Sequence, residues 1–554
     1  MIANLLATAL VLCILGVLFL LIAYLTSLAI LLFVPWTQAY LVFAHWLRLQ
    51  NPARLLTPEA YTLRPFSTRN IRISTSDGLH LGAWHILPTS TPKATLKKIH
   101  ANEPLAPRPR RNSGSNGGEE RVVNERTEAI FEEALKAAER VVLYFHGQVG
   151  DRGKSNRIGT YKGIQEAMPS AHIITIDCRG YGDSEGFPSE IGFKTDSFAA
   201  WQWVTERVAS EKVIIYGHSL GSGIATNLCL QLEEQHITPM AMVLDAAFTS
   251  MPDMMTAYRK IPIVRPFARF PFLLNHFKMR LMDRFETVRA VETIKSPLLL
   301  IHGQEDADVL ISNSHTLFHT ALTARRLQSC TKELAVTEAG EAASAEDELA
   351  RAGMDVPFQT SYSTSRDVGS KDSQVLQRTV KGAESMLAKD SQLSPVSSDS
   401  GIESEAASGR SSAFATTPQQ SSSGSGGSAH YQLHHEHEQE HGHGRGQNGQ
   451  GNGQCHTVQL DFPREGSLEY NQEYQIGFLT VEYAVHNTCM DFAISKEVMG
   501  SFLRTVENSR RVQAWGDIPE TAESKRAQEI DLAKVLCNDK LGYVDQSEVP
   551  EVVE

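Results

Sequence analysis

The segment Val213–Leu228 (VIIYGHSLGSGIATNL) carries the pattern of a serine nucleophile. A β-branched apolar run leads into Gly217-His218-Ser219-Leu220-Gly221, which has the form G-x-S-x-G, and small residues with helical spacing follow. In such a strand–turn–helix context the serine stands on a sharp turn, and the glycines remove side chains that would crowd it. We therefore expect Ser219 to be a nucleophile and the main-chain NH of Leu220 to face a developing oxyanion.

Strand patterns recur on both sides of this segment, and each ends in a loop of glycine and polar residues. The runs and their loops are Val141–Phe145 before HGQVG, His172–Ile176 before DCRGYGDSEG, Ala241–Leu244 before DAAFTS, and Pro297–Ile301 before HGQEDAD. A hairpin around Asp77-Gly78 precedes them. Short apolar strands alternating with helical segments predict a mainly parallel sheet flanked by helices, with the loops at one edge. In the second loop we expect Arg179 and Asp183 to form an ion pair.

The order of these motifs resembles that of a known family. HG, DCRGYGDSEG, GHSLG and LDAAFTS, with the upstream DGLHLGAWHILP, are similar to motifs of the α/β-hydrolase superfamily, closest to its membrane-anchored lysophosphatidylserine lipase and monoacylglycerol lipase subfamily. The resemblance covers roughly residues 67–324 and 460–506. It implies an α/β-hydrolase fold and ester hydrolysis with no metal or organic cofactor. It also implies that the H-G loop supplies a second oxyanion NH, which we assign to Gln148 or a neighbour.

The same resemblance implies where the catalytic histidine lies. The family ends in a strand, a His-Asn pair and a closing helix. Here Phe478–Val485 (FLTVEYAV) predicts a strand, His486-Asn487 follows, and a helical pattern continues to Val506. His486 is therefore the expected general base, which takes the serine proton and returns it to the leaving group. His302 and His146 precede glycines in other loops and are poorer alternatives.

A catalytic carboxylate is needed to hold the tautomer of the histidine. The family pattern H-G-x-x-D before a valine places this acid at Asp306, with Val309 in register. Leu310 stands where the family has proline, and Asp308 is close enough to be a rival. Asp245, at the end of the preceding strand, is a weaker one.

The N-terminal segment predicts a membrane anchor. Residues 1–47 contain no charged side chain, and Leu5–Val34 is almost wholly apolar, longer than the roughly 20 residues that cross a bilayer. A charged start and a cleavage site, which would indicate a signal peptide, are both lacking. Trp36, Tyr40 and Trp46 lie where an interfacial aromatic belt is expected. We predict one transmembrane span.

The side of the membrane that the remaining chain faces is left open. Arginines follow the span and no basic residue precedes it: Arg48, Arg54, Arg64, Arg69 and Arg72. The positive-inside rule then predicts a cytosolic domain, and the lack of N-x-S/T sequons agrees with this. The family resemblance implies the endoplasmic reticulum with a lumenal domain instead.

A segment rich in Met, Phe, Pro and Arg, residues 249–292, lies between two core strands above the serine edge. Its apolar residues fit no single period. We interpret it as a cap with an apolar inner face and a basic rim, suited to acyl chains and anionic headgroups. Ordinary crossover helices packed on the sheet are the alternative.

A long low-complexity segment separates the acid from the histidine. Residues 325–459 are rich in Ser, Gly, Gln, Glu and Ala, a composition that cannot bury enough apolar surface to fold. We predict a disordered insertion and a docking segment for a regulatory partner; its histidine-rich tract at 434–444 is interpreted as polar low complexity rather than as a metal site. The predicted order is an anchor and interfacial segment (1–47), hydrolase domain (66–324), insertion (325–459), final strand and helix of the hydrolase domain (460–512) and an acidic tail (513–554).

Net charge and cysteine spacing argue against some classes of function. A net charge of −12 over 554 residues argues against nucleic acid as the partner. Seven scattered cysteines without a C-x-x-C pair indicate neither a disulfide framework nor a zinc site. We predict a membrane-anchored serine hydrolase for lipid esters of the monoacylglycerol or lysophospholipid type. An acyl-thioesterase acting on membrane proteins, and a catalytically silent hydrolase fold used for binding, are the alternatives.

Overall fold

The computed structural model describes residues 2–47, 51–102, 125–257, 271–351, 457–462 and 464–514. The chain forms two compact units, Met1–Arg325 with Tyr431–Glu554, and Arg326–His430. The first unit holds every strand of the described part of the chain. The second unit begins one residue after the predicted start of the insertion, and the sheet of the first unit is completed by strands that follow the second unit in the sequence.

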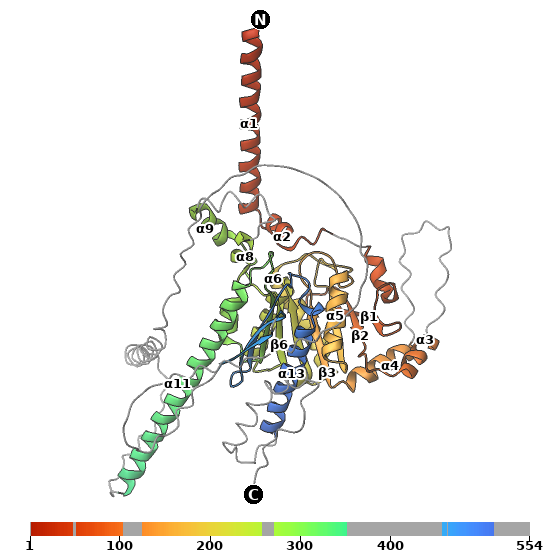
Figure 1. Cartoon of the computed structure of the whole chain (residues 1–554), viewed down its shortest axis with the longest axis vertical. Coiled ribbons are helices and arrows are strands. Elements are labelled where there is room, and N and C mark those ends of the chain that lie inside the picture. Colours follow the sequence, from red (N-terminus) through yellow and green to blue (C-terminus); the bar gives the residue numbers. More distant parts are fainter. Residues whose placement is uncertain are drawn as a thin grey trace, which may run out of the picture. The chain divides into compact units, whose positions relative to one another are not determined.

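A ten-stranded sheet is the centre of the first unit (Figure 1). Its order is β1-β2-β4-β3-β5-β6-β7-β10-β9-β8. The six central strands, β4 to β10, run parallel, and antiparallel strands flank them on both sides. The strands are β1 (Thr68–Ser74), β2 (His80–Ile86), β3 (Arg140–Phe145), β4 (Ala171–Ile176), β5 (Val213–His218), β6 (Ala241–Asp245), β7 (Leu298–Gly303), β8 (Thr457–Phe462), β9 (Gly466–Asn471) and β10 (Ile476–Val481).

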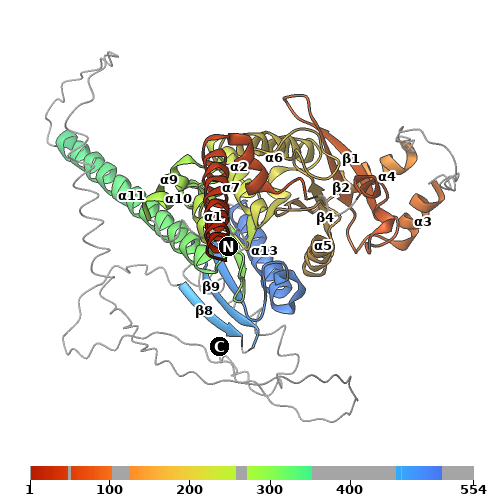
Figure 2. The same cartoon turned by 90° about the horizontal axis from the view of Figure 1, so that it is seen from above.

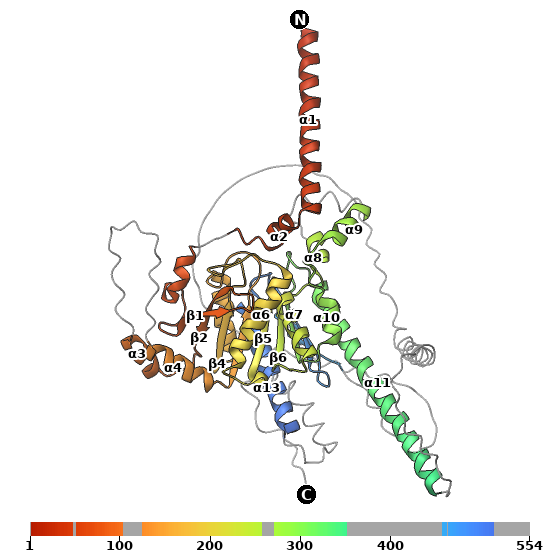
Figure 3. The same cartoon turned by 180° about the vertical axis from the view of Figure 1, so that it is seen from behind.

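Helices cover both faces of this sheet (Figures 2 and 3). One face packs against α6 (Glu190–Thr205), α7 (Leu220–Glu234), α10 (Thr287–Thr293) and the start of α11 (Ser312–Arg351). The other packs against α5 (Ser155–Ala167) and α13 (Ala493–Ala514). The remaining helical elements are α1 (Ile2–Phe33), α2 (Pro35–Phe43), η1 (Pro52–Leu56), η2 (Pro58–Ala60), α3 (Lys93–Asn102), α4 (Glu125–Lys136), η3 (Ser210–Lys212), α8 (Met251–Ala257), α9 (Pro271–Arg280) and η5 (Cys489–Asp491).

The alternation of side chains along the strands explains this sandwich. In β3, Val141, Leu143 and Phe145 belong to one core cluster, whereas Val142 and Tyr144 belong to the other. A parallel strand covered by helices on both faces must be apolar at successive positions, since neighbouring side chains point to opposite faces. The continuous apolar runs in the sequence are the consequence.

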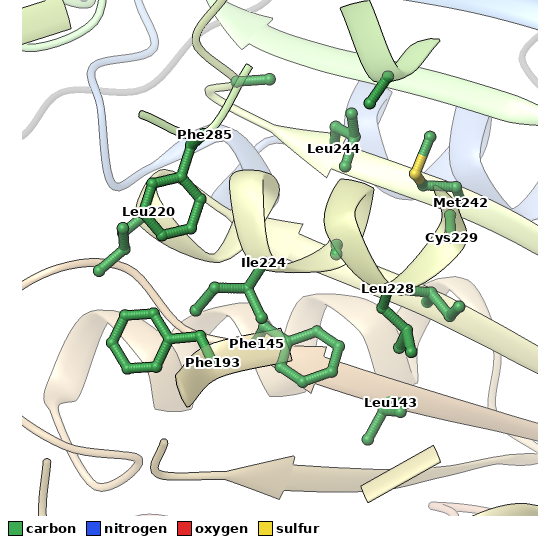
Figure 4. Packing of buried hydrophobic residues seen from close by; sticks show 14 of the residues in the cluster. Leu143, Phe145, Phe193, Leu220, Ile224, Leu228, Cys229, Met242, Leu244 and Phe285 are labelled. Carbon is green, nitrogen blue, oxygen red and sulfur yellow. The ribbon is translucent and has the colours of Figure 1, made fainter. Parts of the chain in front are cut away.

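The helix that follows the serine is held by dense packing (Figure 4). Ile224 and Leu228 of α7 lie among Phe145 of β3, Phe193 of α6 and Phe285, all of them buried. Because buried interiors are close-packed, such a helix has little freedom to shift. The N-terminus of α7, where Ser219 lies, is therefore a fixed point of the fold.

The N-terminal helix has the properties of a membrane span. Within α1, Leu6–Ser27 has a mean hydropathy of 3.0 and none of its residues is buried; of the described residues, only this helix is long and apolar enough to cross a membrane. Proline at the first position of α2 starts a new helix directly after Val34. Ala39, Val42 and Phe43 of α2 are buried in the domain core.

The secondary structure differs from the sequence predictions at several places. Strands β8 and β9 form an antiparallel hairpin that the sequence did not indicate. Helix α11 continues to Arg351, into the predicted insertion, and residues 457–459 already belong to β8. The remaining insertion, with its histidine-rich tract, and the tail from residue 515 lie outside the described residues.

Candidate active site

Ser219 occupies the turn between β5 and α7 in a strained conformation. Its φ is +52° and its ψ is −119°, a region that residues with a side chain rarely adopt. The turn is tight: a Cβ atom at Gly217 would collide with the carbonyl oxygen of Gly221, and one at Gly221 with the carbonyl oxygen of Phe145. The two glycines of G-x-S-x-G are therefore required by the close approach of the backbone. The Ser219 side chain is half-buried at the carboxyl edge of the sheet.

A chain of hydrogen bonds joins the three residues that the sequence predicted for catalysis. His486 Nε2 lies 2.8 Å from Ser219 Oγ, and His486 Nδ1 lies 2.7 Å from Asp306 Oδ2. The residues come from the loops after β5, β10 and β7. These strands end at the same edge because they run parallel in the order β5-β6-β7-β10. The arrangement can move a proton from the hydroxyl to the imidazole while the carboxylate fixes the ring.

Asp306 is held as a carboxylate by its surroundings. Burial by itself would raise its pKa, but hydrogen bonds from His302 and His486 and the NH of Val309 hold the pKa below its ordinary value. Its second oxygen, Oδ1, accepts the main-chain NH groups of Asp308 at 2.8 Å and Val309 at 2.9 Å. A carboxylate that accepts several NH groups is stabilised in its charged form. Asp306 is therefore ionised, and its Oδ2 atom is oriented toward His486.

The rival acids have other positions. Asp308 gives its main-chain NH to Asp306, and the acid bonded to His486 is Asp306. Asp245 is buried, accepts a hydrogen bond from the Tyr216 hydroxyl at 2.9 Å, and has its pKa raised to about 6 by that burial. Its main-chain carbonyl accepts the NH of Ser219 at 2.9 Å. Asp245 thus supports the serine turn through its backbone.

The rival histidines also have structural surroundings. His302 lies fully buried, with Nε2 2.8 Å from the carbonyl oxygen of Val309 and Nδ1 2.7 Å from Ser314 Oγ. His146 is buried with Nε2 2.9 Å from Asp177 Oδ1, and burial lowers its pKa. Neither ring is the one bonded to Ser219 Oγ.

The loop after β3 lies beside the serine and is shaped by a buried arginine. A Cβ atom at Gly147 would lie 3.1 Å from Ser219 Cβ, so the loop touches the nucleophile. Arg157 Nη2 donates to the carbonyl oxygens of Gly147 (2.7 Å), Gln148 (3.2 Å) and Val149 (2.8 Å). In a trans peptide the C=O and the next N–H point in opposite directions. The NH groups of Gln148 and its two successors therefore point away from Arg157.

Two residues of this site were not singled out in the sequence. Arg157 is a buried charge in the first turn of α5, and a cation on the covered side of a helix is the signal that could have revealed it. His218, the residue before Ser219, places Nε2 2.8 Å from the carbonyl oxygen of His486. Its position inside the motif is visible in the sequence, but its partner is 268 residues away.

The predicted ion pair between Arg179 and Asp183 is wrong. Arg179 instead binds the buried Asp196 at 2.7 Å and Asp77 at 2.8 Å. Asp183 binds Arg152 at 2.5 Å. The fold brings these partners in from the α6 and β1–β2 segments and the loop before α5, which local sequence did not reveal. Within the described ranges, no group of three or more His, Cys, Asp or Glu side chains is arranged to hold a metal ion.

The cap segment is described at both of its ends, and residues 258–270 lie outside the described part. Met251, Met255, Leu281 and Phe285 are buried in the core, as crossover helices would require. Two of the predicted basic rim residues are neutralised by acids: Lys278 Nζ lies 2.7 Å from Asp253, and Arg284 Nε lies 2.7 Å from Glu286. At its described ends this segment therefore has the buried core contacts expected of crossover helices, and its basic residues Lys278 and Arg284 are paired with acids.

Comparison with known proteins agrees with the fold. Residues 140–290 match a family model described as the alpha/beta hydrolase fold. The sheet order, the serine turn after β5 and this match coincide on the same strands. The chain has the α/β-hydrolase fold. Its long segment between α11 and β8 is inserted between the strands that carry the acid and the histidine.

Two of the three relatives described here are named lipases. Lysophosphatidylserine lipase ABHD12 of Danio rerio is 28% identical over 300 residues, which cover 53% of this chain and 68% of that protein. The Gallus gallus protein of the same name is 29% identical over 291 residues, covering 52% and 68%. Protein ABHD12B of Homo sapiens is 33% identical over 199 residues, covering 35% and 54%. These similarities and the fold support the class of serine ester hydrolases.

Proposed function

We propose that this α/β-hydrolase is a membrane-anchored lipase that cleaves monoacyl lipid esters through an acyl-Ser219 intermediate. The observation that carries the proposal is the hydrogen-bonded series Ser219–His486–Asp306 at 2.8 and 2.7 Å. A silent scaffold has no need to keep a strained serine in contact with an imidazole and a buried carboxylate. The proposal that the fold serves only for binding is therefore the weaker one.

In the acylation step Ser219 Oγ attacks the ester carbonyl carbon while His486 Nε2 takes the hydroxyl proton. Asp306 keeps the Nδ1 hydrogen toward itself and stabilises the imidazolium. The carbonyl oxygen becomes an oxyanion, for which we propose the NH groups of Leu220 and Gln148 as donors. Collapse of this intermediate breaks the ester C–O bond, and His486 gives its proton to the departing alcohol.

Deacylation repeats these steps with water. Water attacks the acyl carbon of Ser219 as His486 takes one of its protons, and the fatty acid leaves when Ser219 Oγ regains a proton from the imidazolium. Each proton and electron pair is accounted for by the side chains of this chain. We therefore propose no metal and no organic cofactor.

Two features support lipid esters as the substrate class. The relatives are named lysophosphatidylserine lipases, and α1 is long and apolar enough to hold the enzyme at a bilayer. We place lysophospholipids first and monoacylglycerols second. A thioester of a membrane protein is the second candidate function, because the same acyl-enzyme chemistry would cleave it.

A fluorophosphonate probe tests the enzymatic proposal, because it reacts covalently with an activated serine. The full chain should be labelled, Ser219→Ala should not, and Ser210→Ala, on the opposite edge of the sheet, should be labelled as the wild type. Labelling that persists in Ser219→Ala would contradict the proposal. Turnover of lysophosphatidylserine, monoacylglycerol and palmitoylated peptide by the purified protein then ranks the substrates.

We propose the endoplasmic reticulum as the location, and a protease-protection assay on intact microsomes decides the face. Three of the five arginines that favoured a cytosolic domain have polar partners in the fold: Arg69 binds Glu132 at 2.8 Å, Arg72 binds Asp183 at 3.0 Å, and Arg64 binds the carbonyl oxygen of Thr89 at 3.0 Å. Arg48 lies outside the described residues. Charges inside a folded domain have less weight in the positive-inside rule than charges in short flanking loops. Digestion without detergent would show a cytosolic domain, and protection a lumenal one.

A further inference from the structure

Helix α2, which directly follows the apolar helix α1, is hydrogen-bonded to loops at the catalytic edge of the sheet. The last carbonyls of a helix lack partners within the helix. Here Val42 O accepts a hydrogen bond from the Gln148 side chain, in the loop beside Ser219. Phe43 O accepts one from the Tyr181 hydroxyl at 2.7 Å. The C-terminal end of α2 is therefore completed by two loops of the catalytic edge.

The same helix is bound to the end of the cap. Gln38 Nε2 donates to the carbonyl oxygen of Arg280 at 3.2 Å, and Gln38 Oε1 accepts the NH of Met282 at 3.2 Å. Because Val34 alone separates α1 from α2, a membrane that contains α1 must end close to α2. The catalytic domain cannot turn away from that surface without breaking these bonds.

The surface around α2 exposes large apolar side chains. We call it the apolar patch; it consists of Trp36, Tyr40, Phe187, Phe272, Met279 and Met282. Exposure is high at Trp36 (61%), Phe272 (80%) and Met279 (65%). Figures 1 and 3 show α2, α8 and α9 gathered near the inner end of α1, and α1 contacts α9.

Ring contacts and the Gln38 bonds link four members of the patch: Trp36, Tyr40, Phe187 and Met282. The rings of Trp36 and Tyr40 are 5.8 Å apart, and those of Tyr40 and Phe187 are 5.6 Å apart. Gln38, between the two aromatic residues of α2, reaches Met282 on the cap side. Clustered exposed apolar side chains mark an interaction surface, whereas single ones do not.

We propose that the apolar patch lies in the headgroup region of the bilayer that α1 crosses, so that the enzyme takes its ester directly from the adjoining leaflet. This inference rests on the proposed function for the membrane span and the lipid substrate. Tryptophan, tyrosine and phenylalanine are the side chains that favour this depth of a membrane. Continuity with α1 makes the bilayer the occupant, since any other partner would have to fit between the patch and the membrane.

Photocrosslinking in lipid nanodiscs tests the inference on the full chain. We would place p-benzoylphenylalanine at Phe272 and, separately, at Phe187, where it replaces a similar ring. The control is the same residue at the exposed Glu211 in η3, the short helix directly before β5. Glu211 is at the opposite end of a six-residue strand, about 20 Å from Ser219. After irradiation, mass spectrometry should find phospholipid adducts at both patch positions and none at position 211.

The outcomes separate this inference from the proposed function. Adducts only to protein at positions 272 and 187 would show a partner or a second copy on the patch and would overturn the inference, as would the absence of any lipid adduct. Fluorophosphonate labelling of the same samples reports the activated serine independently. If labelling fails while lipid adducts form, the proposed catalysis is wrong and the membrane contact stands.

Turnover gives a second, functional test. Trp36→Glu should lower hydrolysis of a monoacyl lipid held in nanodiscs several-fold, because a carboxylate at this depth opposes contact with the bilayer. Trp36→Phe, which keeps an apolar ring, should restore most of it. Both variants should hydrolyse a short-chain soluble ester at the rate of the wild type. Equal losses on both substrates in Trp36→Glu would overturn the inference, since they would assign Trp36 to the fold.

Discussion

His218 Nε2 donates a hydrogen bond to the main-chain carbonyl oxygen of His486 at 2.8 Å. The acceptor is a carbonyl, so this nitrogen carries the hydrogen. Burial lowers the pKa of His218 to about 3, which keeps the ring neutral at physiological pH. Two residues of the serine turn therefore contact His486. His218 binds the main-chain carbonyl of His486, and Ser219 Oγ binds its ring. Such a contact fixes the histidine loop before substrate arrives.

The position of the acid predicts a large loss of turnover for substitution of Asp306 and little loss for substitution of Asp308. Asp306→Asn should lower kcat by about 10⁴, because an amide favours the wrong histidine tautomer. Asp308→Asn is the matched control: it keeps the main-chain NH that Asp306 accepts and should have little effect. Steady-state turnover of a soluble ester, with thermal melting to confirm folding, measures both. A larger loss in Asp308→Asn would make Asp308 the acid.

The buried arginine of α5 should act on catalysis through the loop that it binds. Arg157→Lys keeps the charge but cannot reach three carbonyls with the planar guanidinium geometry. We expect kcat to fall by about 10- to 100-fold with a nearly unchanged KM, somewhat less than loss of an oxyanion donor outright. Lys162→Ala, an exposed change on the same helix, is the control. A change confined to KM or to melting temperature would contradict the positioning role.

Asp245 should make stability depend on pH in a defined direction. Its pKa in the fold is about 6, above the ordinary value of 3.8, because burial disfavours the charge. The folded protein thus binds an additional proton between these values, and stability falls as pH rises from about 4 to about 6. Asp245→Asn removes this loss and should gain about 3 kcal/mol relative to the wild type between pH 4 and pH 7.

Melting of both proteins across this pH range measures the gain. Tyr216→Phe is a matched variant, since the Tyr216 hydroxyl stabilises the Asp245 carboxylate. It should steepen the loss of stability above pH 4. A constant difference between Asp245→Asn and the wild type at all pH values would show that Asp245 has an ordinary pKa.

The insertion should be dispensable for labelling by the probe. Arg325 anchors α11 to the domain: its guanidinium binds the carbonyl oxygen of Ser296 at 2.6 Å, and residues 326–331 are exposed or half-buried. Replacing Cys330–Gln454 by about 20 Gly/Ser residues keeps β8 intact and adds little closure entropy. Probe labelling and melting temperature should be nearly unchanged. Loss of labelling in a folded variant would show that the segment contributes to the site.

Local sequence determined the elements of the catalytic edge because the signals are themselves local. A serine between glycines after a buried strand specifies its own turn, since the steric limits involve only neighbours such as Gly217 and Gly221. Continuous apolar runs specify buried parallel strands, and one long apolar segment specifies α1. The fold class, Ser219 and His486 could be named from these patterns and from the family resemblance, which also placed the acid at Asp306 with Asp308 as a rival.

Partners that meet from distant segments were decided by the tertiary structure. The choice of Asp306 over Asp308 depends on which of the two carboxylates the turn after β7 places next to His486, which lies 180 residues after Asp306 in the sequence. Arg157, the β8–β9 hairpin and the true partners of Arg179 likewise depend on the path of the chain. The sequence carries each side chain, but a hydrogen bond or ion pair needs two groups within about 3 Å. Only the packed sheet, by bringing separate loops to one edge, sets that distance.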